Sequence, residues 1–190
     1  ARDPQAILSL TINLILSGFG MYLSSGSYPA SQAEHLISHL YNMLDSNNPQ
    51  HNLHGEEIAV TSYYMAKLQE NILSQDAAPL IKEKFPKARF FKKVFPEFAP
   101  DAYKEYSKKN ELIKMQNNLQ QRLEDNWENI KTEIRSDFLA SWNIKEIYEA
   151  AGGSIEIASL NWSAEQFEFS CKNAYLIRNR FTFLDLLARE

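Results

Sequence analysis

The sequence predicts an all-α fold, a compact bundle of about eight helices that forms one domain over residues 1–190. Apolar residues recur at spacings of three and four along most of the chain, as they do on one face of a helix. Capping residues and prolines mark the ends of these periodic stretches. No long stretch alternates between apolar and polar residues as a strand would, and SIEIASL (residues 154–160) alternates only briefly. With 44% hydrophobic residues, the chain is long enough to bury a core.

The charge balance and cysteine content narrow the functional classes. A net charge of −4 gives no basic excess, so nucleic acid is excluded as a partner. The densest basic stretch, residues 82–93, could contact an anion or RNA, but a solvated face with inward aromatics is favoured. Cys171 is the single cysteine, which suits a reducing, cytoplasmic location. It could be a nucleophile, but an inert buried thiol is favoured.

The N-terminal stretch predicts a helix, with Asp3 as cap and Pro4 in its first turn. Residues 6–23, AILSLTINLILSGFGMYL, could be a signal-peptide core, a membrane span or a buried helix. Four Ser, Thr and Asn side chains interrupt it and no basic cluster precedes it, so a buried helix is predicted, without a membrane. A start at ARDP, without methionine, is expected of a piece of a longer protein or of a processed product.

Two helices are expected next, over residues 30–44 with Ser31 as a candidate cap, and over residues 55–74, which open on two glutamates. DSNNPQHN (residues 45–52) has the composition of the loop between them. Residues 75–100 contain four prolines and are expected to form short helices and turns.

An amphipathic stripe follows over residues 102–138, where apolar residues recur at helical spacing. Core packing is favoured over a partner-binding helix. Residues 144–151 predict a shorter helix that stops at Gly152 and Gly153. A helix capped by Ser163 is expected over residues 163–177, and Thr182 is expected to cap the last one.

All four histidines lie between residues 29 and 57. His35 and His39 are four residues apart and therefore share a helix face, and His54 begins the next helix after a loop that can fold back. Two helices could thus direct imidazoles at one point, and imidazole suits zinc, iron and nickel. The alternative is surface or core histidines without a role, and His51 is expected to be a plain surface residue. No GxGxxG, P-loop, HExxH or recognisable Ser-His-Asp pattern accompanies them.

Four stretches of the sequence resemble a known family. PASQAEHLISH (residues 29–39) followed by LHGEEIAV (residues 53–60) resembles the metal-dependent polyol dehydrogenases, the group of the iron-containing alcohol dehydrogenases and glycerol dehydrogenases. Its glycerol-1-phosphate dehydrogenase branch usually reads PASGxEHxxSH and then LHGE, so Gln32 replaces a glycine here. AYLIRNRFTFLDLL (residues 174–187) is similar to the closing IRxRYTxLDLL, and SGFGM (residues 17–21) to an SGxAM pattern.

The resemblance implies an all-helical domain with a catalytic metal, zinc or alternatively iron or nickel. His35 and His54 correspond to the two histidine ligands. The third ligand, an aspartate, belongs to an N-terminal nucleotide-binding domain that is absent from this chain and that binds NAD(P). His39 corresponds to a histidine near the metal that contacts substrate or relays a proton. The implied role is the metal- and substrate-binding half of an oxidoreductase of phospholipid metabolism, inactive alone.

The implied substrate is a small phosphorylated polyol or ketone, and the family reaction reduces dihydroxyacetone phosphate to sn-glycerol 1-phosphate. Gln32 and Tyr28 depart from the family pattern beside the ligand helix, so the substrate of this chain stays open, as does assembly into a homo-oligomer. Two other functions remain: a free-standing, non-catalytic helical binding module, and a lyase similar to dehydroquinate synthase, whose motifs fit less well.

Overall fold

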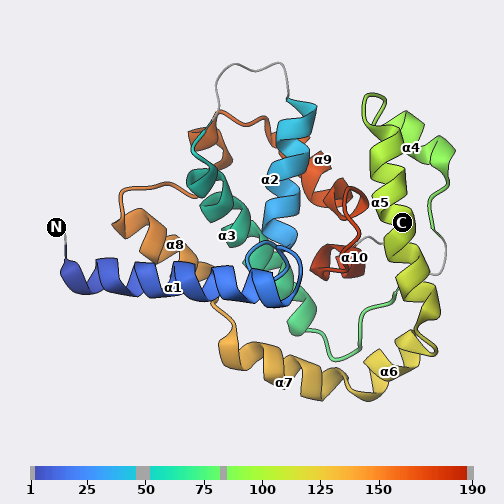
Figure 1. Cartoon of the computed structure of the whole chain (residues 1–190), viewed down its shortest axis with the longest axis horizontal. Helices are drawn as coiled ribbons and strands as arrows, with labels where there is room; N and C mark the ends of the chain where they lie inside the picture. The colour runs from blue at the N-terminus through green and yellow to red at the C-terminus, as the bar shows by residue number, and fades with distance from the viewer. Residues whose placement is uncertain (1–2, 46–51, 82–84, 188–190) are drawn as a thin grey trace. The chain divides into compact units, whose positions relative to one another are not determined.

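The computed structural model describes residues 3–45, 52–81 and 85–187. These ranges contain ten α-helices, two short 3-10 helices and no strand, which confirms the all-α prediction (Figure 1). The contacts within the chain divide it into two compact units, Ala1–Gln32 and Ala33–Glu190. The single-domain organisation stays a prediction.

The first unit consists of helix α1 (Pro4–Leu23) and a turn. The Asp3 carboxylate accepts a hydrogen bond from the Gln5 amide at 2.9 Å, and Pro4 occupies the first turn, as predicted. No residue of α1 is buried, so the prediction of a buried helix is wrong. A helix that is apolar nearly all round is normally covered by protein or lipid, but α1 is the one helix described in its unit, so no neighbour within that unit covers it. By length and composition alone, α1 could cross a membrane.

The turn after α1 explains why the next helix begins later than expected. The Ala30 amide donates to the Ser27 carbonyl at 3.0 Å, so it closes a turn instead of starting a helix. The Gln32 side-chain amide donates to the Tyr28 carbonyl. Helix α2 then begins at Ala33, three residues after the predicted Ala30.

The second unit is built around α2 (Ala33–Leu44), which packs against α3 (His54–Leu73) and α9 (Ala164–Asn173). Figure 1 shows α2 and α3 side by side. Tyr41 stacks on Trp162 with ring centroids 4.2 Å apart, which joins α2 to the segment before α9. The Ser163 hydroxyl caps α9 by accepting from the Gln166 amide, as predicted. The core between these elements is apolar and centres on Leu36, Ile37, Leu40, Val60, Phe167 and Leu176.

Helices α4 (Ala88–Val94) and α5 (Ala99–Met115) pack against each other, and α5 contacts the 3-10 helix η2 (Ala174–Leu176). Phe91, within the basic stretch, is fully buried in the main core. This supports the solvated-face interpretation for residues 85–93, while residues 82–84 lie outside the described ranges. Helix α10 (Phe183–Leu187) closes the described chain, and the Thr182 hydroxyl accepts from the Leu184 amide at 3.3 Å.

The amphipathic stripe of residues 102–138 is divided among α5, α6 (Leu119–Asp125) and α7 (Trp127–Asp137). Helix α5 ends at Met115, where Gln116 is extended, and Asn118, with a left-handed backbone at φ 55, then precedes α6. Leu112 and Met115 are 57% and 73% exposed, so core packing is the wrong interpretation for them. Trp127 does pack with Ile72 in a second, smaller core.

Helix α8 (Ser141–Ala150) packs against α3 and ends as predicted, because Gly152 adopts φ +89. The alternating SIEIASL forms no strand, and its end is the 3-10 helix η1 (Ile157–Leu160).

Candidate metal site

Helices α2 and α3 bring three imidazoles together. His35 and His39 lie one turn apart on α2, and His54 is the first residue of α3. The ring centroids of His35 and His54 are 5.2 Å apart, whereas His39 lies 6.1 Å from each of them. The four-residue spacing and the packing of the two helices therefore produce one cluster. His51 lies outside the described residues.

The centroid separations divide this cluster into a pair and a third ring. A cation about 2.0–2.1 Å from one nitrogen of each ring, at a tetrahedral angle, places two imidazole centroids about 5 Å apart. The 5.2 Å separation of His35 and His54 fits this value, and 6.1 Å would require a far wider angle at the metal. His35 and His54 are the pair whose spacing suits a shared cation. The described residues include no set of three or more His, Cys, Asp or Glu that could hold a metal.

Two carboxylates flank the pair. The His35 Nδ1 atom lies 2.8 Å from Glu34 Oε1, and the His54 Nδ1 atom lies 3.9 Å from Glu57 Oε2. Glu57 is buried and accepts hydrogen bonds from Ser38 Oγ at 2.7 Å and Asn42 Nδ2 at 2.9 Å. From the sequence, Glu57 was expected only as an acidic residue at the positive end of α3, and this hydrogen-bond network was missed. The spacing of His35, Ser38 and Asn42 could have indicated it, because these residues form a polar stripe on an otherwise apolar helix.

The surroundings of His39 disfavour its protonated form. Burial lowers the pKa of this imidazole below its ordinary value of 6.5, and the positive charges of Arg178 and Arg180 lower it further, together with His35 and His54. His39 is therefore a neutral imidazole at neutral pH. In that form one ring nitrogen donates a hydrogen bond and the other accepts one.

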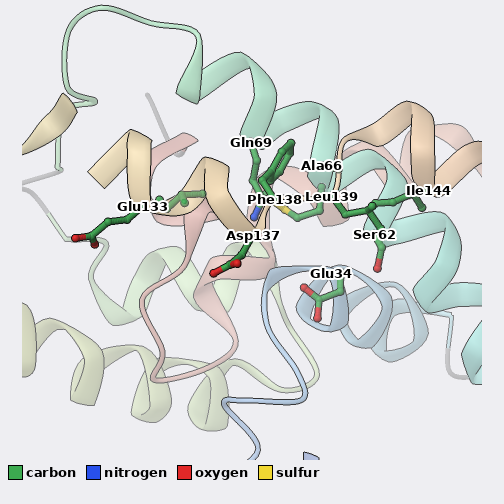
Figure 2. A pocket seen from close by; sticks show the side chains of 11 residues that line it. Glu34, Ser62, Ala66, Gln69, Glu133, Asp137, Phe138, Leu139 and Ile144 are labelled. Atoms are coloured by element: carbon green, nitrogen blue, oxygen red, sulfur yellow. The ribbon is translucent and has the colours of Figure 1, made fainter. Parts of the chain in front are cut away.

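A cleft of about 580 Å³ lies among α2, α3, α7 and α8 (Figure 2). Glu34, the hydrogen-bond partner of His35, belongs to its wall, together with Glu133, Asp137 and apolar residues such as Phe138. No histidine lines this cleft, and its carboxylates repel anions. It is therefore unsuited to a phosphorylated ligand.

Cys171 does not take part in this site. It packs against the main core from α9, and burial raises the pKa of its thiol to about 12. Since the thiolate is the reactive form, the environment supports the inert-thiol interpretation over a nucleophile.

The fold and the site together define an all-α protein with a two-imidazole candidate metal site at the junction of two helices. Among curated proteins, the chain is similar to the glycerol-1-phosphate dehydrogenase [NAD(P)+] of Thermococcus sibiricus (strain DSM 12597 / MM 739), with 47% identity over 66 residues. The aligned segment covers 35% of this chain and 18% of that relative. No protein-family model matches the chain, and no solved structure matches it.

Proposed function

We propose that this chain is the metal- and substrate-binding part of an NAD(P)-dependent dehydrogenase that acts on a small phosphorylated polyol or ketone. The reaction would resemble the interconversion of dihydroxyacetone phosphate and sn-glycerol 1-phosphate. The observation that carries the proposal is the 5.2 Å spacing of His35 and His54. The partial similarity to an NAD(P)-dependent glycerol-1-phosphate dehydrogenase supports it.

In this proposal His35 and His54 hold zinc, or alternatively iron or nickel, through one ring nitrogen each. The bound metal would act as a Lewis acid on the substrate oxygen. Two imidazoles make up half of a tetrahedral set, so the site would be completed by a carboxylate outside the described residues and by substrate or water. Such a set leaves the open position that a catalytic site needs.

His39 would contact substrate or relay a proton. It is a neutral imidazole beside the metal pair, and its two ring nitrogens differ in hydrogen-bonding role. Arg178 and Arg180 place positive charge near the same ring, which favours a substrate that carries a phosphate. The nicotinamide cofactor would be held by a nucleotide-binding domain outside these 190 residues, whose surface meets the imidazoles across a cleft.

We propose a cytoplasmic location, on the basis of a single cysteine and the polar residues that interrupt the apolar α1. The exposed apolar side chains of α1 would then pack against protein rather than lipid. Recovery of the expressed protein in membranes after alkaline washing would contradict this location.

The test is an activity assay on the product of the complete reading frame that encodes this chain. NADH and NADPH oxidation with dihydroxyacetone phosphate is expected, and His35→Ala or His54→Ala should lower the rate by about 100-fold or more, because each removes a metal ligand. His51→Ala is the matched control within the same histidine-rich strip. Wild-type rates in both ligand variants would contradict the proposal, as would robust turnover by the 190 residues alone.

A further inference from the structure

Both imidazoles of the candidate pair have a carboxylate beside the same ring atom. Glu34 Oε1 lies 2.8 Å from His35 Nδ1, and Glu57 Oε2 lies 3.9 Å from His54 Nδ1. A carboxylate accepts hydrogen bonds and cannot donate them, so an Nδ1 atom that contacts it carries the proton. In a neutral ring the lone pair is then on Nε2. The 2.8 Å contact therefore selects, for His35, the tautomer with Nε2 available to a cation, and the same arrangement at His54 would select it once the ring approaches Glu57.

Glu57 is held in place by more than its neighbour on the helix. Its side chain is 4% exposed, and its Oε2 atom accepts from Ser38 Oγ and Asn42 Nδ2, both on α2. Burial of a carboxylate is costly unless hydrogen bonds compensate for the lost water. The network fixes the oxygen that faces His54, although His54 itself is 59% exposed at the start of α3. An exposed imidazole thus has a buried carboxylate beside it that two hydrogen bonds from α2 hold in place.

We propose that Glu34 and Glu57 are positioning residues that orient His35 and His54 through their Nδ1 atoms and direct both Nε2 atoms at one divalent cation. This inference rests on the proposed metal site and assigns two residues to it that the sequence motifs left without a role. The Glu57–His54 contact is longer than a hydrogen bond and would shorten when the cation fixes the ring. Ser38 and Asn42 contribute indirectly, because their hydrogen bonds hold the Glu57 carboxylate in place.

The experiment measures zinc affinity by competition with a chromophoric chelator, in the product of the complete reading frame. Glu57→Met removes the acceptor at similar volume and should weaken zinc binding about 10–100-fold, the usual effect of losing such a partner. Glu57→Gln keeps an acceptor oxygen and should recover part of the loss. Glu34→Gln should weaken binding more mildly, and Glu149→Gln, an exposed glutamate on α8, is the control for the change in charge.

Two further measurements distinguish a folding defect from a loss of imidazole orientation. The absorption spectrum of the cobalt-substituted protein reports ligand geometry and should change in Glu57→Met. Asn42→Ala, at the partly buried end of the network, should weaken zinc binding by a smaller factor while the circular dichroism spectrum is unchanged.

The outcomes separate this inference from the proposed function. If His35→Ala and His54→Ala abolish zinc binding while the Glu34 and Glu57 variants bind within about twofold of wild type, the positioning role is overturned and the metal site stands. If the two histidine variants bind zinc as wild type does, the proposed site itself is overturned.

Discussion

Replacement of Lys109 by methionine should destabilise the fold more than any surface change, because Lys109 is half of a buried ion pair. Its Nζ atom lies 2.6 Å from Asp185 Oδ1, with side chains 2% and 8% exposed. Nζ also donates to the Tyr175 carbonyl, and Asp185 Oδ2 accepts from the Thr182 amide at 2.8 Å. Burial lowers the pKa of Lys109 and raises that of Asp185, and each partner partly offsets the shift of the other.

Lys109→Met leaves the Asp185 carboxylate buried without its counter-charge, which costs about 3–5 kcal/mol in the free energy of unfolding. The double variant Lys109→Met/Asp185→Leu removes both charges and should be more stable than the single variant, because no unpaired charge remains. Urea unfolding of the chain, followed by circular dichroism, measures all three proteins. A loss below about 1 kcal/mol in the single variant, or a double variant no more stable than the single one, would refute the reasoning.

Three further predictions follow from single side chains. Tyr41→Phe should lower the free energy of unfolding by about 1–3 kcal/mol, because the Ser163 amide, 2.8 Å from the Tyr41 hydroxyl, loses its acceptor; an unchanged urea midpoint would contradict this. Cys171, whose thiol pKa is raised to about 12 by burial, should react with iodoacetamide at neutral pH only after unfolding, and rapid labelling of the folded chain would contradict this. His39 binds a proton more weakly when folded, so the unfolded chain takes up more protons as the pH falls through 6.5 and stability declines. His39→Gln should flatten this decline, and an identical pH profile in the variant would count against the lowered pKa.

Helix boundaries followed from the sequence where a local signal sets them. The Asp3 cap, the Ser163 cap and the glycine stop at Gly152 each depend on one residue and its immediate neighbours. The division of the amphipathic stripe at Asn118 did not follow, because helical spacing continues through a residue in the left-handed conformation. Apolar periodicity reports which face of a helix is apolar, not whether the helical path is unbroken.

The exposure of α1 could not be predicted from its composition. A helix that is apolar nearly all round is expected to avoid water, but its sequence does not specify which surface covers it. Its exposed side chains, such as Leu14 at 65%, show that composition alone does not determine burial.

The candidate site was predicted in part. The spacing of His35 and His39 and the position of His54 placed three imidazoles near one another, and the family resemblance singled out His35 and His54 as the ligands. Helical spacing alone could not choose between the three rings, and their separations add that choice from geometry, with 5.2 Å for the His35–His54 pair. The role of Glu57 was also hidden, because a glutamate in the first turn of a helix has a local explanation in the helix dipole. Its hydrogen bonds from Ser38 and Asn42 depend on how α2 and α3 pack, which no local pattern specifies.

The most direct test of the metal site is a zinc titration of the product of the complete reading frame, with X-ray absorption at the zinc edge. We predict one bound zinc per chain with two imidazole nitrogens at about 2.0–2.1 Å. We also expect loss of that zinc in His35→Ala and in His54→Ala, but not in His51→Ala. Wild-type zinc content and an unchanged absorption spectrum in both ligand variants would contradict the account, because the 5.2 Å imidazole pair would then have no part in metal binding.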